Sequence, residues 1–363
     1  MRVVHVGKFY PPEYEGGLER VVVELNAALL RKGVELAAVV AAVRGAGRTE
    51  QVGGVTVRRA ASFGTLLSQP LAPGFARAVR ATGGDVLHLH HPNPLGDLAV
   101  LRDPRPLVVT QHSEIVRQRA LAPMYLPLLR RALGRARFVA IGSEQLLRTS
   151  RELRGFEAKA RVVPFGIDAE RFTATAPVLE RAAELRSRWG GPVVLAVGRL
   201  VAYKGFDVLL RSARDLEATV VIVGSGPEEE RLRSLAAANV VLAGRVSEAD
   251  LVAHYHACDV FCLPSVTIAE AFGMVLLEAM ACAKPLVTTS LPTGVSAVNR
   301  DGRTGLVVPP GDEGALREAL RALLNDEARA RALGEAGRAV QASEYGVALM
   351  AERYLTLYRE AMA

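Results

Sequence analysis

The sequence predicts an α/β protein built from two doubly wound domains. Three observations support this fold class. The chain has 363 residues, more than one hydrophobic core usually serves. Short, continuous apolar runs alternate with helical stretches, as in a parallel sheet covered by helices on both faces. The alternation occurs twice, once in each half of the chain, so each half is expected to form its own sheet.

In the first half, the strand candidates are rich in Val and Ala, and each is separated from the next by a stretch of helical pattern. They are residues 2–7, 35–41, 85–90, 106–112 and 137–143. We assign residues 1–170 to this domain.

The second half repeats the scheme, with strands that end in Gly, Pro or Ser. These candidates are residues 192–198, 219–224, 239–244, 260–265, 285–290 and 305–311. We assign residues 171–344 to the second domain, with a connector and one helix in 172–191. Residues 345–363 predict an amphipathic helix that packs on either domain.

In open α/β sheets, ligands bind outside the carboxyl ends of the strands. Two such sheets are expected to face each other with these edges. The fold class therefore predicts a cleft that suits a substrate bearing a nucleotide.

The composition is that of a folded protein, with 50% apolar and 23% charged residues. The longest weakly polar stretch, residues 34–43, is about half the ~20 residues that a membrane span needs. The N-terminus lacks the pattern of a signal peptide, and we expect a cytoplasmic protein. Cys258, Cys262 and Cys282 lie in apolar segments and are interpreted as core residues, not as disulfides or metal ligands.

The net charge of +7 is compatible with nucleic acid, a membrane surface or phosphorylated substrates. Aromatic residues are only 5% of the chain, and no helix-turn-helix or RNA-binding pattern occurs, so no nucleic-acid partner is expected. The segment 114–138 has six arginines and one glutamate among apolar residues. It fits either a peripheral contact with an anionic membrane or a solvated helix face.

Gly16 and Gly17 follow the first strand and directly precede a helix that begins near Leu18. Glycines at this place let backbone N–H groups approach an anion at the positive end of the helix. A tight turn without a ligand explains them equally well.

The usual dinucleotide and P-loop glycine motifs are absent after the strands. Instead, Arg199 and Lys204 lie in the loop after the strand 192–198. This loop is expected at the carboxyl edge of the second sheet, where two cations could hold a diphosphate. Lysine is scarce in the chain, with five among 45 basic residues, which favours a specific role for Lys204 over a solvated charge.

Glu270 and Glu278 bound an apolar run. If residues 271–279 are helical, the two acids lie about 12 Å apart along the axis. Paired carboxylates that act on one glycosidic bond lie about 5–9.5 Å apart. The spacing therefore favours one acid near each end of an extended ligand, such as a sugar nucleotide. A helix cap and a buried pair are the structural alternative.

His112 ends the strand 106–112. It is therefore expected to point from the first domain toward the same cleft. His88, His90 and His91 are interpreted as packing and hydrogen-bonding residues, because no carboxylate set accompanies them. No D-x-D motif occurs. We expect no metal site and no cofactor, with Arg199 and Lys204 in place of a cation.

Four segments together resemble a known family: EGGLERVV, GRLVAYKGFDVLL, PSVTIAEAFGMVLLEAMACAKPLV and NRDGRTGLVVPPGD. In this order and spacing they are similar to family 4 of the retaining nucleotide-sugar glycosyltransferases, over nearly the whole chain. The resemblance implies the GT-B fold, with two Rossmann-like domains and a C-terminal helix that crosses back to the first domain. It also implies transfer of a sugar with retained configuration and without a metal ion.

The resemblance also implies roles for individual residues, carried over to their positions in this sequence. Gly16 and Gly17 would border the diphosphate, which Arg199 and Lys204 would neutralise. Glu270 would meet the hydroxyls of the donor sugar, and Glu278 those of the ribose. The remaining implied contacts are His112 with the donor sugar, the backbone of Val246 with the base, and the backbone N–H groups of Phe272, Gly273, Met274 and Val275 with the sugar and phosphate.

In the mechanism that the resemblance implies, the acceptor attacks from the face that the diphosphate leaves, and a phosphate oxygen takes the acceptor's proton. Neither glutamate is then a nucleophile. The sequence departs from the family pattern at Ser113, Ala283 and Asn299. The variant at Asn299, with the segments 62–73 and 88–99, is similar to bacterial mannosyl- and rhamnosyltransferases of surface polysaccharide assembly.

The expected function is a retaining hexosyltransferase, with GDP-mannose as the leading donor and a saccharide or lipid-linked saccharide as the acceptor. The enzyme alternative is a sugar-phosphate synthase or phosphorylase of the same fold. The other alternative is a non-catalytic protein that binds anions or nucleic acid. Candidate acceptor residues in the first domain are Glu13, Tyr14 and Ser62.

Overall fold

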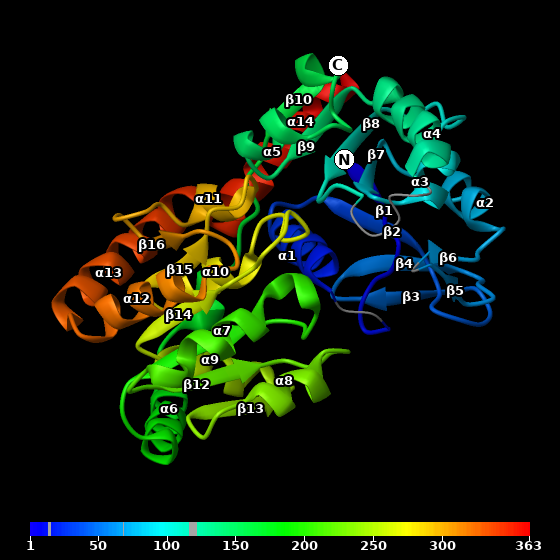
Figure 1. Ribbon diagram of the computed structural model, residues 1–363. Helices are drawn as coiled ribbons and strands as arrows, with labels where there is room; N and C mark the ends of the chain where they lie inside the picture. The colour runs from blue at the N-terminus through cyan, green and yellow to red at the C-terminus, as the bar shows by residue number, and fades with distance from the viewer. Residues whose placement is uncertain (14–15, 68, 116–121) are drawn as a thin grey trace. The chain divides into compact units, whose positions relative to one another are not determined.

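The structure is a computed structural model that describes residues 1–13, 16–67, 69–115 and 122–363. Tyr14 and the middle of the basic segment, residues 116–121, lie outside the described residues. The chain forms two compact units (Figure 1). Unit 1 comprises Met1–Gly166 and Val347–Ala363, and unit 2 comprises Ile167–Gly346. The α/β class with two Rossmann-like units is confirmed.

Within the described residues, unit 1 contains an eight-stranded sheet in the order β10-β9-β8-β7-β1-β2-β4-β3. All neighbours are parallel except β3 and β4. The strands are β1 (Arg2–Val6), β2 (Glu35–Ala41), β3 (Arg48–Val52), β4 (Val55–Ala60), β7 (Val86–His91), β8 (Leu107–Gln111), β9 (Phe138–Ile141) and β10 (Ala160–Val162). A separate antiparallel pair is formed by β5 (Thr65–Leu66) and β6 (Gln69–Pro70).

The helices of unit 1 lie between its strands in the chain, except for the C-terminal helix α14. They are α1 (Gly17–Arg31), α2 (Phe75–Arg80), α3 (Pro94–Val100), α4 (Ala122–Arg135), α5 (Glu144–Thr149) and α14 (Val347–Met362), with a 3-10 helix at Glu157–Lys159. The C-terminal helix α14 packs on α1 and on the sheet. Its Tyr354 and Tyr358 are fully buried, and its Glu352 pairs with Lys32 of the first unit at 2.9 Å.

The strands β3 and β4 were not among the predicted strands. Their segment is polar, because β3 lies at the edge of the sheet with mostly exposed or half-buried side chains. Gly53 and Gly54 between them both have positive φ. Two glycines between alternating segments are a signature of a tight hairpin turn, and this signal could have found the pair.

Within the described residues, unit 2 contains a six-stranded parallel sheet in the order β13-β12-β11-β14-β15-β16. The strands are β11 (Val193–Val197), β12 (Thr219–Val223), β13 (Val240–Gly244), β14 (Val260–Leu263), β15 (Leu286–Thr289) and β16 (Gly305–Val308). Central strands such as β11 are buried along their whole length. This burial explains why they appear in the sequence as continuous apolar runs.

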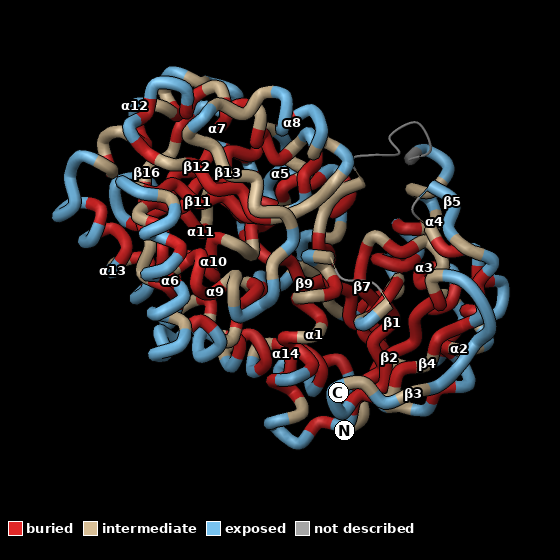
Figure 2. The backbone as a smooth tube through the Cα atoms, turned by 90° about the horizontal axis from the view of Figure 1, so that it is seen from below, coloured by how far each residue is buried: buried red, intermediate tan, exposed pale blue. Residues whose placement is uncertain are grey.

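The helices of unit 2 cover both faces of its sheet. They are α6 (Ala176–Trp189), α7 (Phe206–Ser212), α8 (Glu229–Leu235), α9 (Glu248–Ala257), α10 (Met274–Ala281), α11 (Gly294–Val298), α12 (Glu313–Leu324) and α13 (Glu327–Glu344). Short 3-10 helices lie at Ala169–Phe172, Ala202–Lys204 and Ala213–Asp215. Figure 2 shows buried strands inside each unit and exposed outer helix faces.

Each unit has its own hydrophobic core around its sheet. Cys258, Cys262 and Cys282 are buried and free, as their apolar contexts predict. Burial raises the pKa of the Cys258 thiol to about 11. Among the helices that the structure describes, none has the length and apolar character to cross a bilayer.

Candidate functional site

The two sheets each have a point where the strand order reverses. In unit 1, β1 and β7 are neighbours, and the chain continues outward from them in opposite directions. In unit 2, β11 and β14 have the same relationship. Loops that leave the carboxyl ends of such neighbouring strands form the usual ligand crevice of a doubly wound sheet. The loops after β11 and β14 carry Lys204 and Glu270.

The loop after β11 is held against the loop after β14. Lys204 ends a short 3-10 turn and is followed by Gly205 in the left-handed region, with φ +67°. A Cβ atom on Gly205 would lie 2.1 Å from the carbonyl oxygen of Pro264. The backbone N–H of Val266 donates to the carbonyl of Tyr203 at 2.9 Å. Only glycine permits this close approach, which places the Lys204 side chain beside the second loop.

Lys204 and Glu270 form a buried ion pair, with Nζ 2.5 Å from Oε2. Their side chains are only 10% and 9% exposed. The hydroxyl of Ser265 donates to the same carboxylate oxygen at 3.2 Å, and Ser265 is itself fully buried. Burial, the largest single influence, lowers the pKa of Lys204, but the charge and hydrogen bond of Glu270 together with Tyr203 and Glu278 outweigh it, and the pKa lies above its usual value. The lysine is therefore a fixed cation.

Arg199 differs from Lys204, although the sequence suggested an equivalent pair of cations. Its side chain is exposed, and within the described residues no hydrogen bond or ion pair holds its guanidinium. The two cations of this loop thus have different states: Lys204 is buried and paired, and Arg199 is free to meet a ligand.

The helix α10 begins at Met274, not at residue 271 as predicted. Gly273 precedes it in the left-handed region with φ +80°, so the helical conformation cannot extend back to Glu270. Glu270 consequently lies in the loop and reaches Lys204, and does not cap the helix. The backbone N–H groups of Met274 and Val275 lie in the first turn of α10, where N–H groups lack partners inside the helix.

Phe272 is buried and meets the ring of Tyr345 edge-on, with centroids 6.1 Å apart. A Cβ atom on Gly294 would lie 2.6 Å from Cδ2 of Phe272. The backbone N–H of Gly294 donates to the carbonyl of Ala271 at 2.8 Å. The start of α11 therefore fixes the loop that leads into α10.

Glu278 is 1% exposed and accepts a hydrogen bond from the hydroxyl of Tyr255 at 2.7 Å. Its charge is also one cause of the raised pKa of Lys204. Glu270 and Glu278 thus both favour the charged form of Lys204.

Val246 follows β13 and is half-buried just before α9.

Asn299, one of the departures from the family pattern, is a structural residue. It is 1% exposed, and its amide donates to Thr288 Oγ1 at 2.8 Å and to the carbonyl of Leu306 at 3.0 Å. The hydroxyl of Thr304 donates to its side-chain oxygen at 3.0 Å. These bonds tie β15 to β16. The uncharged amide of Asn299 thus satisfies the polar groups of Thr288, Thr304 and Leu306 that surround it.

In unit 1, Gly16 is the N-cap of α1 in extended conformation, and Gly17 is exposed. A Cβ atom on Gly17 would meet nothing within 4 Å, so there is open space at the start of this helix. Earlier in the chain, the carbonyls of Tyr10 and Pro11 accept hydrogen bonds from Arg59, which is 1% exposed.

Two of the acceptor candidates have structural partners. Glu13 pairs with Arg48 and Arg59 and accepts the backbone N–H of Val43 at 3.0 Å. The hydroxyl of Ser62 donates to the carbonyl of Gly64 at 3.0 Å.

Lys8, which follows β1, was not considered in the sequence. It is half-buried, and burial lowers its pKa, against the opposing influence of Glu19. Lysine is scarce in the chain, and this scarcity, which singled out Lys204, could also have singled out Lys8.

His112 belongs to a buried series of imidazoles. Its Nε2 lies 2.9 Å from Nδ1 of His90, and Nε2 of His90 lies 2.8 Å from Nδ1 of His5. His88 lies beside them but bonds to Thr110 and Tyr358. Burial lowers the pKa of His5 and His112 to about 3.

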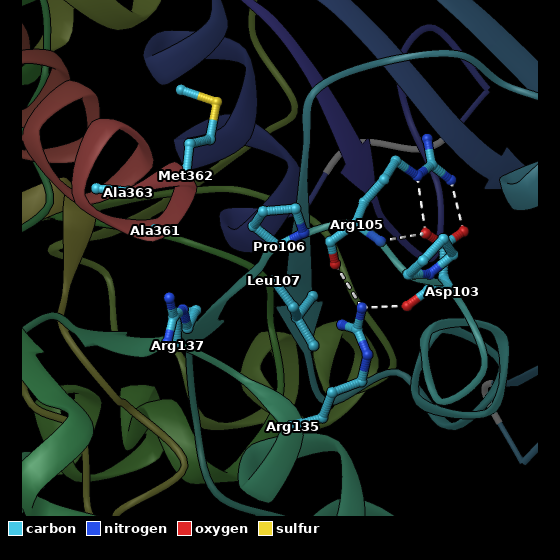
Figure 3. Close-up of a pocket in the computed structure, with 10 residues that line it drawn as sticks. Asp103, Arg105, Pro106, Leu107, Arg135, Arg137, Ala361, Met362 and Ala363 are labelled. Carbon is cyan, nitrogen blue, oxygen red and sulfur yellow. Dashed lines mark hydrogen bonds and ion pairs between the residues drawn. The ribbon is translucent and has the colours of Figure 1, made fainter.

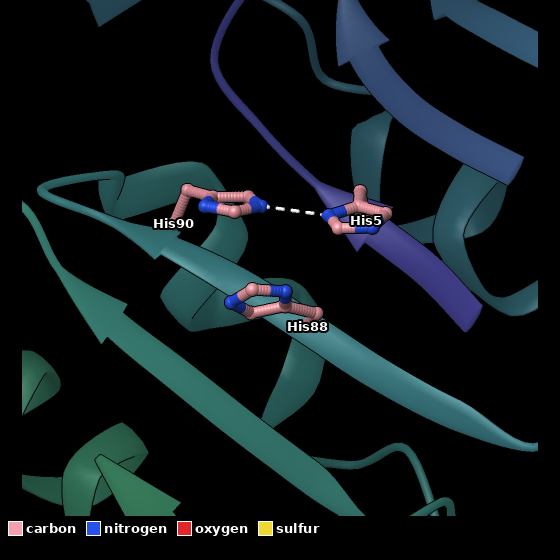
Figure 4. Close-up of side chains that lie close together, drawn as sticks. All are labelled: His5, His88 and His90. Carbon is pink, nitrogen blue, oxygen red and sulfur yellow. Dashed lines mark hydrogen bonds between the residues drawn. The ribbon is translucent and has the colours of Figure 1, made fainter. Parts of the chain in front are cut away.

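One nitrogen each of His5, His88 and His90 lies within 4.8 Å of the others, which is close enough for a metal ion. Figure 4 shows the rings of His5 and His90 joined by their hydrogen bond, with His88 on the same strand as His90. Both nitrogens of His88 and of His90 already bond within the protein. The arrangement is therefore one of hydrogen bonds between imidazoles.

A pocket of about 400 Å³ lies at the opposite, amino edge of the unit 1 sheet, around Arg105 and Arg135 (Figure 3). Arg105 bonds to the carboxylate of Asp103 and to the carbonyls of Thr82 and Val79. Arg135 donates to the carbonyls of Asp103 and Arg105. These arginines tie loops together and lie away from the carboxyl ends of the strands.

Two family models match the chain. Residues 15–171 match Glycosyltransferase Family 4, and residues 180–340 match Glycosyl transferases group 1. A curated relative, the D-rhamnosyltransferase WbpZ of Pseudomonas aeruginosa, is 34% identical over 92% of this chain and 89% of its own length. The chain belongs to the family 4 glycosyltransferases.

Other relatives of this glycosyltransferase support the same family. The O-antigen chain mannosyltransferase C of Escherichia coli is 32% identical over 99% of this chain and 98% of its own. Among solved structures, sucrose-phosphate synthase from Thermosynechococcus elongatus has a TM-score of 0.82 at 23% identity and covers 99% of both chains. HepE from Anabaena in complex with UDP has a TM-score of 0.81 at 19% identity, covering 99% of this chain and 100% of its own. The two structures support the GT-B fold.

Proposed function

We propose that this glycosyltransferase moves a hexose from a nucleotide sugar to a saccharide or lipid-linked acceptor in glycan biosynthesis, with retention of configuration and without a metal ion. We take mannose from GDP-mannose as the leading donor. The observation that carries the proposal is the buried pair of Lys204 and Glu270, formed by the loops after β11 and β14. The relatives named as mannosyl- and rhamnosyltransferases support the choice of sugar.

In this proposal, the diphosphate of the donor binds where Arg199 and Lys204 provide positive charge. Glu270 accepts hydrogen bonds from hydroxyls of the donor sugar while it holds Lys204 in place. The backbone N–H groups of Phe272, Gly273, Met274 and Val275 bind the sugar and phosphate, which suits the positive start of α10.

The other proposed contacts complete the donor site. Glu278 binds the ribose hydroxyls, and the backbone of Val246 seats the base. Gly16 and Gly17 border the diphosphate, and the open space at Gly17 admits such a group. His112 contacts the donor sugar.

The chemistry follows from the fixed cation. As the sugar–phosphate bond breaks, negative charge develops on the diphosphate, and a preorganised positive group stabilises it without rearrangement. The oxygen that leaves takes the proton of the attacking acceptor hydroxyl on the same face of the sugar. Neither carboxylate forms a covalent bond in this scheme.

The donor is tested first by thermal unfolding with UDP, GDP and ADP, followed by hydrolysis of the matching sugar nucleotides. GDP is expected to raise the melting temperature most. Glu270→Ala is expected to abolish transfer, and full activity in that variant would refute the role of Glu270. Transfer in excess EDTA and the anomeric configuration of the product, read by NMR, test metal independence and retention.

The acceptor is tested with lipid-linked saccharides and phosphorylated monosaccharides in parallel. The second class is included because a relative from Kineococcus radiotolerans, 33% identical over 96% of this chain, is named D-inositol 3-phosphate glycosyltransferase. If only the phosphorylated monosaccharide accepts the sugar, the natural acceptor is a soluble sugar phosphate and not a lipid-linked saccharide.

We also propose that unit 1 contacts a membrane surface peripherally. Phe63 is 79% and Leu66 60% exposed around the β5–β6 hairpin, and Met124 in α4 is 81% exposed. Residues 60–76 carry no charge. Apolar side chains that protrude from an uncharged hairpin can enter the boundary of a bilayer, and the net charge of +7 of the chain favours anionic lipids.

A further inference from the structure

We propose that His90 and His5 hold His112 in the tautomer that carries its proton on Nδ1, so that His112 offers an N–H donor to its ligand. The use of this donor rests on the proposed contact of His112 with the donor sugar. The tautomer itself follows from three hydrogen-bonded rings, two on the neighbouring strands β1 and β7 and one directly after β8.

The rings are positioned by the sheet. His5 on β1 lies beside β7, which carries His90, and His112 follows β8 on the other side. The backbone N–H of His112 donates to the carbonyl of His91 at 3.2 Å, which extends the strand pairing to this residue. The ring of His112 stacks on Phe165, with centroids 5.2 Å apart. Its direction is therefore fixed.

The two hydrogen bonds are coupled through His90. Each bond between two imidazole nitrogens needs one N–H and one lone pair, and a neutral imidazole has one of each. Burial keeps these rings neutral near pH 7, because it lowers the pKa of each. If Nε2 of His90 accepts from His5, then Nδ1 of His90 must donate to His112. All three protons thus point the same way along the series.

Only two arrangements satisfy both bonds. In the first, His5 and His90 donate toward His112, whose Nε2 accepts and whose Nδ1 carries a proton. In the second, every proton is reversed, and Nδ1 of His112 becomes an acceptor.

The far end of the series decides between them. Nε2 of His5 is buried and has no hydrogen-bond partner among the described residues. The second arrangement would place an N–H there, and a buried N–H without a partner is rarer than an unpaired acceptor. The first arrangement leaves only a lone pair at that position. It also makes Nδ1 of His112 a donor, and no described residue takes up that nitrogen.

His112 is 6% exposed, and oxygen atoms of a sugar hydroxyl or a phosphate are suitable acceptors for its N–H. His90 and His5 act as positioning residues, because they set the proton on His112 without touching the ligand themselves.

The test is NMR of the whole chain with ¹⁵N-labelled histidine. Long-range correlations between ring nitrogens and carbon-bound protons distinguish the two tautomers. We expect His5, His90 and His112 to be protonated on Nδ1. An Nε2-protonated or cationic His112 near pH 7 would overturn the inference, as would stoichiometric zinc bound by His5, His88 and His90.

Variants of His5 provide a matched pair. In His5→Asn the side-chain amide can stand where Nδ1 stood and still donate, so the tautomer of His112 is expected to persist. His5→Leu has no donor, and His112 is expected to become a mixture of tautomers. In active enzyme, His5→Leu should lower kcat about threefold to tenfold, the worth of one hydrogen bond, with an unchanged KM for the nucleotide sugar.

The control is His88→Gln, on the same strand as His90 and equally buried but outside the series. It is expected to leave the tautomer of His112 unchanged. If His5→Leu fails to fold, the spectrum of the unmodified protein and that of His5→Asn still decide the matter. Unaltered transfer by His112→Ala would refute only the proposed contact with the sugar, because the tautomer is read without turnover.

Discussion

The carboxylate of Glu270 lies 2.5 Å from the ammonium of Lys204 although 66 positions separate them in the chain. The pair joins the loops of two neighbouring strands at the point where the strand order of unit 2 reverses. Breaking a buried pair leaves one charge without compensation, which costs about 3–5 kcal/mol. The stability of unit 2 therefore depends on a pair that the proposed reaction also uses.

The first prediction is a double-mutant cycle on this pair. Glu270→Gln alone should reduce the free energy of unfolding by about 3 kcal/mol, because the charge of Lys204 stays buried. Adding Lys204→Met should recover part of that loss, with a coupling energy of about 1–3 kcal/mol. Urea unfolding measures both.

The exposed pair of Arg338 and Glu335 is the matched control, and its coupling should stay below about 1 kcal/mol. Additive effects of the two substitutions in the buried pair would show that the ion pair does not form in solution.

The second prediction concerns Gly205. Gly205→Ala combines a left-handed backbone with a contact of 2.1 Å to the carbonyl oxygen of Pro264. The substitution should lower the free energy of unfolding by at least about 2 kcal/mol more than the same substitution at a left-handed glycine with open space around it. Gly302 has the same φ of +67° and nothing within 4 Å of a Cβ atom, so Gly302→Ala is the control. Equal melting temperatures for the two variants would contradict the close approach of the loops.

The third prediction is a loss of stability of unit 1 in mild acid. Burial lowers the pKa of His5 and His112 to about 3, whereas unfolded histidine titrates near 6.5. Between these values the unfolded state binds more protons, so stability falls as pH falls from about 6.5 toward 3, by up to about 1.4 kcal/mol per pH unit for each histidine. His91 opposes this trend, because burial, the largest single influence on its pKa, is outweighed by Asp97, Gln111 and Glu152 together, and the pKa is raised.

The measurement is the free energy of unfolding between pH 4 and 7 for the unmodified protein and His5→Asn. The slope should be smaller in His5→Asn, which removes one titrating ring, and unchanged in Arg214→Ala, an exposed substitution in unit 2. Identical slopes for His5→Asn and the unmodified protein would mean that His5 is not buried in its neutral form.

The fourth prediction tests membrane contact. Phe63→Ser and Leu66→Ser should each weaken sedimentation with vesicles of phosphatidylglycerol and phosphatidylcholine by about tenfold or more, since burying one large apolar side chain contributes about 1.5–3 kcal/mol. Leu179 in α6 is also exposed, at 50%, and Leu179→Ser should have no effect. Equal vesicle binding by all three variants would exclude the hairpin as the contact.

The predicted strands that became central strands were those with continuous apolar runs, such as β11 and β14. The strands β3, β4 and β10 escaped prediction because polar residues interrupt their apolar ones, whereas the half-buried edge strand β13 was found from its continuous apolar run. The start of α10 was also misplaced, since an apolar run alone does not reveal that Gly273 adopts a left-handed conformation.

The candidate site followed a similar division. Lys204 was assigned to a loop at the carboxyl edge from the strand pattern, and Glu270 was expected at the start of a helix, in contact with the donor sugar as the resemblance implies. No sequence pattern indicated that Lys204 and Glu270 bond to each other. His90 was treated as one of a local triplet with His88 and His91, and its bonds to His5 and His112 were missed because these residues come from separate strands.

By itself, the sequence determined the α/β class, the repeated pattern of strands and helices and the residues of the family motifs, because periodicity, glycine spacing and apolar runs are local properties. Tertiary structure alone decided which charges are paired and which nitrogens share a proton. Such pairs depend on how strands distant in the sequence lie side by side in the sheet. A buried lysine is a fixed cation, and a buried histidine a neutral donor, only through neighbours that the order of residues does not reveal.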